Sequence, residues 1–494
     1  MSPARTPRII AFLCEWCAYA AADKAGASHQ VYPQSLLTVR VPCTGRVEPA
    51  MVLQAFREGA DGVLVGGCHP GDCHHVDGNV RAAARLTLLT RALEQLRIPR
   101  ERLRVEWVGA AEGPRFAEVV TQMTAELTAL GPLDYQRRAL DSIEDALHAT
   151  PARLHQLEQG RAAPRAPGKP RVAFYWNASC GGCEEAVVDL GDGFAALAAA
   201  VEIVLWPVAL DAKKADIEAM PDGHIDVAFI NGAIRLDEQD HWAVLLRRKA
   251  RTVIAFGACA HLGGVVGLGN LSEPETILAT AYRDQPSVSN PEQVLPGRPV
   301  QAGGHELTLP ALLSRTLPLE AAVPVDFTIP GCPPSPPVIQ AAVDLLLGGG
   351  PLPPPGSVLS PNASLCDSCP RNGSRPERLQ LTALASLATT QPDEVTCFLA
   401  QGLVCHGPAT RQGCQPGCVE ANMPCRGCFG PLDGVVDGGA AMLSAFASLF
   451  SGDEATQKAL AESLPDPAGT FWRYGLAASL LPRRLPERLP GEAP

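Results

Sequence analysis

Seventeen cysteines constrain this 494-residue chain more than any other feature. They fall into three groups: five before residue 74, four between Cys180 and Cys332, and eight between Cys366 and Cys428. The first residues lack the basic and then long apolar pattern of a secretory signal, so we expect a cytoplasmic protein. Because cytoplasmic thiols are kept reduced, these cysteines are expected to bind metal or to react rather than to form disulfides.

The charge balance argues against two classes of partner. The chain has 41 Lys and Arg against 52 Asp and Glu, a net charge of −11, which disfavours nucleic acid and anionic membrane surfaces. Its longest apolar stretch, 193–210, contains Glu202 and Pro207, so we predict no transmembrane segment. The length predicts about three domains.

Residues 1–133 alternate apolar runs with helical patterns, which predicts an α/β domain with a parallel sheet. The expected strands are Arg8–Leu13, Gly62–Val65 and Leu103–Val108. The expected helices are Pro49–Glu58, Val80–Leu96 and Pro114–Leu130. Cysteines follow the first two strands, at the sheet edge where chemistry gathers in such folds.

Residues 171–350 repeat the pattern and predict a second parallel-sheet domain. Its expected strands are Arg171–Trp176, Val201–Val208, Ile225–Ile230, Thr252–Phe256 and Val325–Ile329. The connector 134–170 combines a charged amphipathic helical segment, Asp134–Gly160, with the Pro- and Arg-rich Arg161–Pro170. A second linker, Gly348–Pro355, leads to a cysteine-rich segment, 351–434, and the final part, 435–494, has one expected helix at Gly439–Leu449 and a Pro-rich end.

Four cysteines of the second domain lie in three loops that follow expected strands: Cys180, Cys183, Cys259 and Cys332. These loops bring four thiolates to one sheet edge, which is the ligand set of a [4Fe–4S] cluster. Adjacent glycines let backbone amides approach the sulfides. A structural zinc site also uses four thiolates, but zinc ribbons pair two Cys-x2-Cys turns, whereas here one pair meets two single cysteines. We therefore favour a cluster.

The cysteine-rich segment holds enough ligands for two further four-ligand clusters. Its cysteines are Cys366, Cys369, Cys397, Cys405, Cys414, Cys418, Cys425 and Cys428. Because the segment has too little apolar periodicity to build a core, bound metal is expected to supply its folding energy. Two zinc ions would satisfy the same count, and the spacing leaves open which cysteines share a centre.

The first group offers five thiols, Cys14, Cys17, Cys43, Cys68 and Cys73. A [2Fe–2S] cluster using four of them is one hypothesis, and we expect both Cys14 and Cys17 to bind. A redox-active thiol pair is the other, since Cys-x2-Cys after a strand is also typical of thiol–disulfide chemistry. The neighbouring His69, His74 and His75 are expected to be solvated or hydrogen-bonded rather than ligands.

No catalytic residue is predicted. The Gly-rich Gly263–Gly269 lacks the Lys-Ser/Thr of a phosphate loop, and neither GxSxG nor HExxH occurs. Glu184 and Glu185 could relay protons, although such acids more often stabilise a helix start. The chain is interpreted as a path for electrons rather than as a reaction site.

These motifs resemble those of one enzyme family. Residues 171–483 are similar to the small subunit of [NiFe]-hydrogenases of the F420-non-reducing, methyl-viologen-reducing type. The similarity lies in Ser179-Cys180-Gly181-Gly182-Cys183-Glu184, Gly257-Ala258-Cys259, Pro330-Gly331-Cys332-Pro333-Pro334, Gly407-Pro408-Ala409-Thr410-Arg411, Asn422-Met423-Pro424-Cys425-Arg426-Gly427-Cys428 and Asp466-Pro467-Ala468-Gly469-Thr470-Phe471. Residues 8–133 resemble the delta subunit of that hydrogenase, through Cys14–Cys17, Cys43-Thr44-Gly45-Arg46-Val47 and Gly67-Cys68-His69-Pro70-Gly71-Asp72-Cys73-His74. The respiratory complex I relative is disfavoured, because it has adjacent cysteines where this chain has Cys180-x2-Cys183.

The resemblance implies a fusion of two subunits into one electron-transfer chain. Its fold would be two flavodoxin-like parallel-sheet domains plus a ferredoxin-like 2[4Fe–4S] segment. The Cys180–Cys332 group would hold the proximal cluster, facing a separate large subunit with the nickel-iron site, and the Cys366–Cys428 group would hold the medial and distal clusters. The delta-like domain would pass electrons from a [2Fe–2S] cluster to a flavin-containing, heterodisulfide-reductase-like partner. Three [4Fe–4S] clusters and one [2Fe–2S] cluster require about fourteen irons.

Two alternatives remain open from the sequence. The chain could serve the same role in a complex whose large subunit has lost nickel and iron. It could instead be a zinc-stabilised interaction protein or a thiol sensor.

Overall fold

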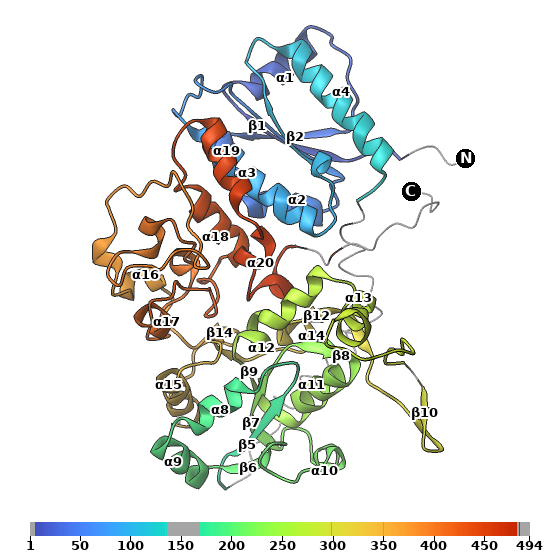
Figure 1. The fold of residues 1–494 in the computed structure, drawn as a ribbon, viewed down its shortest axis with the longest axis vertical. Coiled ribbons are helices and arrows are strands. Elements are labelled where there is room, and N and C mark those ends of the chain that lie inside the picture. Colours follow the sequence, from blue (N-terminus) through green and yellow to red (C-terminus); the bar gives the residue numbers. More distant parts are fainter. Residues whose placement is uncertain are drawn as a thin grey trace.

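The N-terminal domain is built on a four-stranded parallel sheet. The computed structural model describes residues 5–133, 135, 168–297, 299–348, 350–481 and 484. The strands, β1 (Ile9–Cys14), β2 (Leu36–Val41), β3 (Gly62–Gly67) and β4 (Leu103–Trp107), pair in the order β2-β1-β3-β4. Helices α1 (Ala18–Ala27) and α4 (Gly113–Leu130) cover one face, and α2 (Pro49–Arg57) and α3 (Gly78–Gln95) cover the other (Figure 1). The predicted strands and helices are present with small shifts at their ends, whereas α1 and β2 were not predicted.

The middle domain has a six-stranded parallel sheet in the order β14-β13-β9-β7-β5-β6. Its strands are β5 (Arg171–Trp176), β6 (Glu202–Leu205), β7 (Ile225–Asn231), β9 (Ala250–Phe256), β13 (Phe327–Ile329) and β14 (Ser357–Val358). The apolar runs that predicted most of these strands are explained by their burial between two helical layers. The strand predicted over Val201–Val208 is shorter, since Pro207 cannot donate to the sheet. The parallel α/β prediction is confirmed for both sheets.

Helices close both faces of the middle sheet. One layer contains α8 (Gly182–Val188), α9 (Asp192–Ala200) and α15 (Pro336–Leu347), and the other contains α10 (Lys214–Ala219), α11 (Asp237–Lys249), α12 (Ala258–Leu262) and α14 (Leu319–Ala322). Beyond the sheet lie η3 (Val265–Leu271), α13 (Pro274–Ala279), the antiparallel pair β8 (Ile234–Leu236) and β12 (Leu312–Leu317), and a hairpin of β10 (Val300–Ala302) and β11 (His305–Leu307). The hairpin extends away from the domain (Figure 1).

The cysteine-rich segment contains little regular structure. Its longest helices are the single turns α16 (Leu365–Ser368) and α17 (Gly417–Glu420), and its apolar cluster centres on Phe398, Leu403 and Val419. The predicted linker Gly348–Pro355 leads from α15 to β14, which adds an edge strand to the middle sheet. The cysteine-rich segment is therefore anchored at its start to the middle sheet through β14.

The C-terminal helices pack against the N-terminal domain. They are α18 (Gly438–Ala447), which was predicted, and α19 (Glu454–Ser463) and α20 (Pro467–Phe471), which were not. Leu443, Phe446 and Trp472 share one core with α2 and α3. Figure 1 shows these helices between the N-terminal domain and the rest of the molecule.

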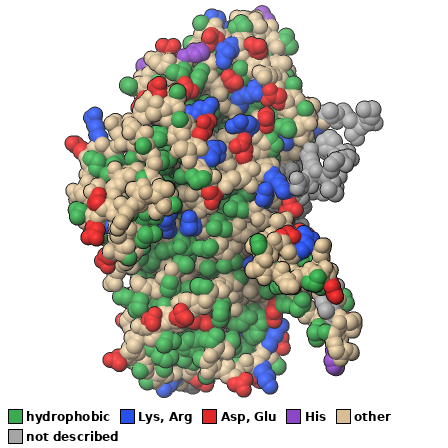
Figure 2. All heavy atoms as spheres, viewed as in Figure 1, with side chains coloured by type: hydrophobic (Ala, Val, Ile, Leu, Met, Phe, Trp, Pro, Cys, Tyr) green, Lys and Arg blue, Asp and Glu red, His purple; other side chains and the backbone are tan. Residues whose placement is uncertain are grey.

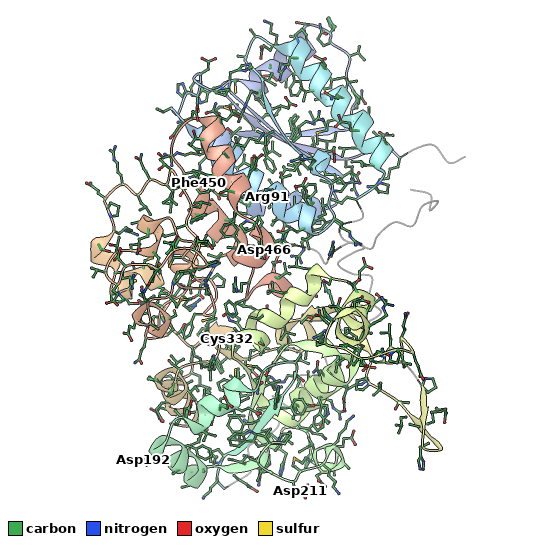
Figure 3. All side chains as sticks on the ribbon, viewed as in Figure 1. Arg91, Asp192, Asp211, Cys332, Phe450 and Asp466 are labelled. Atoms are coloured by element: carbon green, nitrogen blue, oxygen red, sulfur yellow. The ribbon has the colours of Figure 1, made fainter. Side chains whose placement is uncertain are left out.

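Polar contacts reinforce this junction. Arg91 donates to the carbonyls of Ala461, at 2.8 Å, and Leu464, and Gln95 donates to Asp466 at 2.7 Å (Figure 3). Of the connector, Tyr135 and residues 168–170 are described, and the helical prediction for Asp134–Gly160 otherwise falls outside the described residues. Tyr135 is buried against Phe56 and donates to the carbonyl of Leu480 at 2.6 Å. Among the described residues, no helix is both long and apolar enough to cross a membrane.

Candidate metal centres

Four cysteines of the middle domain converge at the carboxyl edge of its sheet. Cys180 and Cys183 follow β5, Cys259 follows β9 and Cys332 follows β13. Burial, and then the nearby Cys259, Cys332 and Cys180 thiols, raise the pKa of Cys183 well above its usual value. Burial and the Cys332 and Cys180 thiols raise the pKa of Cys259 to about 12. Because the ionised forms of these four thiols repel one another, a bound cation would stabilise them. The sequence prediction of a metal centre at this group stays a prediction.

Two glycines make this convergence possible. Gly257 has φ +87°, and a Cβ there would lie 2.4 Å from the Cys183 sulfur. Gly264 has φ +59°, and a Cβ there would lie 2.5 Å from the Cys259 sulfur. Any side chain at either position would occupy the space beside the thiols.

One side of this cysteine group faces solvent. Cys180 and Cys332 are exposed, as are the neighbouring apolar side chains of Trp176, Val188 and Val265. In Figure 2, hydrophobic side chains gather over parts of the lower half of the molecule, whereas charged side chains are interspersed over the N-terminal domain at the top. Glu184 is buried, and this burial raises the pKa of its carboxyl group. Hydrogen bonds from the side chains of Asn231 and Trp206 lower that pKa by a smaller amount.

The structure divides the eight later cysteines into two sets. Cys366, Cys369, Cys397 and Cys405 line one cavity of about 30 Å³, and the Cys366 thiol lies close enough to Cys369 and Cys397 for their charges to raise its pKa, after burial. Cys414, Cys418 and Cys428 form the second set. Burial and then the charge of Cys332 raise the pKa of Cys428 to about 12, and the charges of Cys414 and Cys418 contribute to the same increase. Cys425 also lines the first cavity. Burial and then the charges of both Cys405 and Cys428 raise its pKa, so Cys425 lies between the two sets.

The second set directly adjoins the middle domain. The backbone N–H of Cys332 donates to the Cys428 thiol, and the charge of Cys332 also acts on Cys428. The Tyr474 hydroxyl bonds to the Cys332 thiol and lowers its pKa, against the larger effect of burial. Figure 3 places Cys332 where the middle domain meets the rest of the chain. Sequence reasoning missed Tyr474, because no motif marks a tyrosine that reaches a cysteine from a distant segment.

The first set approaches the N-terminal domain. Leu381, in the loop between Cys369 and Cys397, pairs through its backbone with Leu449 and Ser451 around Phe450. Arg81, near the start of α3, donates to the carbonyl of Ser448 at 2.9 Å. Gly78, three residues earlier, lies beside the Cys43 and Cys73 thiols, where a Cβ would be 2.5 Å from the Cys43 sulfur. A continuous series of contacts therefore joins the two regions.

All five N-terminal cysteines gather at the carboxyl edge of their sheet. The sulfurs of the buried Cys14, Cys17 and Cys68 lie within 4.8 Å of one another. The Cys43 and Cys73 sulfurs are 3.9 Å apart, and the thiols of Cys73 and Cys14 contribute, after burial, to raising the pKa of Cys43 to about 11. Hydrogen bonds, first from the Cys17 thiol, lower the pKa of Cys14 to about 6. The group thus contains a compact trio with a pair beside it.

The three nearby histidines contact other side chains. His69 bonds to Glu112 at 2.8 Å. The His74 ring stacks on Trp16 with centroids 3.7 Å apart, and the His75 ring meets His74 edge-on at 5.3 Å.

The matched families divide the chain in the same place as its fold. The family described as methyl-viologen-reducing hydrogenase, delta subunit, matches residues 9–131, and the family described as NADH ubiquinone oxidoreductase, 20 Kd subunit, matches residues 180–346. A chain of the NAD+-reducing [NiFe]-hydrogenase in the H2-reduced state aligns at 31% identity over 38% of this chain and 96% of its own length, with a TM-score of 0.33.

Relatives that are matched over their full length give the assignment. The G-type iron–sulfur subunit of the F420-non-reducing hydrogenase of Archaeoglobus profundus is 34% identical over 318 residues, 64% of this chain and 98% of that protein. The D-type iron–sulfur subunit of the same organism is 48% identical over 137 residues, 28% of this chain and 100% of that protein. A further match, 42% identical, covers 26% of this chain and 16% of the A-type subunit of ferredoxin:CoB-CoM heterodisulfide reductase of Methanosarcina mazei. The chain therefore belongs to the iron–sulfur subunits of F420-non-reducing hydrogenases, with a D-type region and a G-type region joined in one polypeptide.

Proposed function

We propose that this chain carries electrons between a nickel-iron site in a separate large subunit and a flavin-containing, heterodisulfide-reductase-like partner. Iron–sulfur clusters would supply the one-electron chemistry. The observation that carries the proposal is the series of thiol groups from the exposed Cys180 through the Cys332–Cys428 contact to the cavity lined by Cys366 and Cys405. Contacts of Leu381, Arg81 and Ser448 then connect this series with the domain that holds the N-terminal trio. The chain itself is expected to catalyse no reaction, in keeping with its assignment as a subunit of an oxidoreductase.

We assign three [4Fe–4S] centres to the middle and cysteine-rich regions. The proximal set is Cys180, Cys183, Cys259 and Cys332, the medial set is Cys414, Cys418, Cys425 and Cys428, and the distal set is Cys366, Cys369, Cys397 and Cys405. The direct contact of Cys428 with Cys332 supports placing the medial set second. Cys425 is given to the medial set because the distal set has four cysteines without it, whereas the medial set would be one ligand short.

The N-terminal domain is proposed to hold one [2Fe–2S] cluster. Cys14, Cys17 and Cys68 would bind it with Cys43, because the charge of Cys14 reaches Cys43. Cys73, the less buried member of the pair, would remain unligated. This assignment keeps both cysteines of the Cys14–Cys17 turn as ligands, as the sequence analysis expected.

One surface and one sequence match support the proposed partners. The exposed Cys180 and Cys332 would present the proximal site to a large subunit, and the exposed Trp176, beside Gly181, adds an apolar contact there. The D-type region matches part of a heterodisulfide reductase subunit, which supports an acceptor of that kind at the other end.

The test is a metal analysis of the complex purified anaerobically with its large subunit. We expect about fourteen irons per chain, with Mössbauer areas of cubane and [2Fe–2S] iron in a ratio of about six to one, because three cubanes hold about twelve irons and one [2Fe–2S] cluster about two. Stoichiometric zinc with little iron would contradict the proposal and favour a zinc-stabilised protein. Iron centres that hydrogen does not reduce in the complex would favour a large subunit without nickel and iron.

A further inference from the structure

Arg371 is a buried cation two residues after Cys369, with 5% of its surface exposed. Its Nη1 donates to the backbone carbonyls of Asp393, at 2.7 Å, and Thr396, at 3.1 Å. Its Nη2 donates to Oδ1 of Asn422 at 2.8 Å. The guanidinium carbon lies 4.0 Å from the centroid of the Phe398 ring.

These contacts hold the guanidinium in place through hydrogen bonds. The three acceptors are uncharged amide oxygens, and within the described part of the chain Arg371 forms no ion pair. The Asp393 carboxylate is exposed to solvent and accepts from the backbone N–H groups of Thr396 and Val395, which lower its pKa first, and the charge of Arg371 lowers it further. Because water screens the exposed Asp393 carboxylate, it compensates the buried guanidinium only weakly, and a further negative charge close by would be favourable.

The four thiols of the distal set supply that charge. Arg371 lines the same small cavity as Cys366, Cys369, Cys397 and Cys405. A cubane with four thiolate ligands is anionic, and its reduction adds a further negative charge. A fixed cation in such an enclosed site stabilises the reduced state more than the oxidised state.

We propose that Arg371 sets the reduction potential of the centre held by Cys366, Cys369, Cys397 and Cys405, and raises it. The proposal rests on the cluster assignment made above. Arg371 is a positioning residue, because its hydrogen bonds also hold the loop that presents Cys397 and connect it with Asn422, which follows Cys418. The raised potential would make the distal centre hold electrons that arrive from the proximal side.

The test measures midpoint potentials in the full complex by redox titration followed by electron paramagnetic resonance. The distal signal is identified as the one missing from a Cys397→Ser variant. Arg371→Gln is expected to shift the equilibrium about tenfold toward the oxidised centre, which is about 59 mV for one electron. Arg371→Lys keeps the charge and should stay near the wild-type potential.

Arg375 provides a matched control. It lines the same cavity and its charge lowers the pKa of Cys366, but its side chain is exposed to solvent. Water screens an exposed charge, so Arg375→Gln is expected to shift the potential far less than Arg371→Gln.

Asn422→Asp keeps the proposal testable if Arg371→Gln fails to assemble. It places a carboxylate on Nη2 of Arg371, and Asn422 has φ +58°, a conformation that Asp tolerates. The reduction potential of the distal centre should fall in Asn422→Asp, as it should in Arg371→Gln. The Asn422→Asp substitution also removes the hydrogen bond from the Asn422 amide to the carbonyl of Pro392. Both variants must lower the potential of the same centre.

Two results would overturn the inference while leaving the cluster assignment intact. One is an unchanged distal potential, at full signal intensity, in Asn422→Asp or Arg371→Gln. The other is an equal shift in Arg371→Lys and Arg371→Gln, which would assign the effect to hydrogen-bond geometry rather than charge. Zinc in place of iron at this site would instead refute the proposed function itself.

Discussion

Each of the two α/β domains places its cysteines at the carboxyl edge of its own sheet, but the helices that cover the two sheets come from different parts of the chain. The middle sheet is closed on both faces by helices from residues 182–347, and its cysteine group is partly open to solvent. The N-terminal sheet has one face whose helices, α2 and α3, are covered by α18–α20 from the other end of the chain, and its cysteine trio is buried. The same architecture thus carries one cysteine group that is partly open to solvent and one that contains a buried trio.

The largest expected effect comes from breaking the shared core. Trp472 is 1% exposed, and its indole N–H donates to the buried Asp437 at 2.7 Å. Trp472→Ala should destabilise the N-terminal domain by about 3–5 kcal/mol. Phe256→Ala, in the core of the middle domain alone, is the matched control. Hydrogen exchange should report loss of protection in α2 and α3 for the first variant only, and equal loss in both variants would remove the distinction between the domains.

Removing one ligand should affect one domain at a time. Cys259→Ala is expected to lose the proximal cubane, about four irons, while the N-terminal [2Fe–2S] signal persists. Cys14→Ser should lose the N-terminal [2Fe–2S] signal and keep the proximal cubane. Iron analysis with electron paramagnetic resonance compares them, and full cubane intensity in Cys259→Ala would show that the proximal assignment is wrong.

Metal removal should follow exposure. In the chain without its large subunit, an iron chelator is expected to bleach the proximal centre several-fold faster than the N-terminal one, because Cys180 and Cys332 are exposed whereas Cys14, Cys17 and Cys68 are buried. Adding the large subunit should slow the first process alone. Bleaching of both centres at one rate, with and without that subunit, would contradict the difference in access.

The pair beside the trio allows a finer comparison. Cys43→Ser is expected to lose the [2Fe–2S] signal, whereas Cys73→Ser should keep most of it, because the charge of Cys14 acts on Cys43 and Cys43 is the more buried of the two. Spectroscopy of the two variants side by side provides the measurement. The opposite result would exchange the roles of the two cysteines.

The smallest expected effect is that of cutting the connector. A protease site introduced between residues 140 and 165 should leave the two fragments associated, since the shared core and the bonds of Arg91 and Gln95 hold them together. Size-exclusion chromatography should give one peak before and after cleavage. Separation into two peaks would mean that the connector, rather than the core, joins the domains.

The sequence predicted those elements whose side chains are buried on both sides. Continuous apolar runs such as Ile225–Asn231 identify central strands, but Leu36–Val41 is exposed along most of its length and escaped prediction. Helix α19 was missed because few of its side chains, such as Leu460 and Ala461, are buried, and their apolar neighbours come from a domain several hundred residues away.

The same reasoning applies to the cysteines. Loops after neighbouring strands predicted the grouping of Cys180 with Cys332, since topology brings strand ends together. The division of the eight later cysteines depends on irregular loops, and spacing alone does not determine it. Arg371 and Tyr474 act through contacts with distant residues, so neither could be recognised in the sequence.

The shared core also has a consequence for the order of synthesis. A ribosome completes α3 long before it reaches Trp472, a delay of roughly tens of seconds at ordinary rates of translation. Throughout that delay the sides of α2 and α3 that α18–α20 cover in the finished structure remain without this cover. Such surfaces attract chaperones and aggregate when left bare. The N-terminal domain is therefore finished only after α18–α20 have been made, long after the last strand of its own sheet.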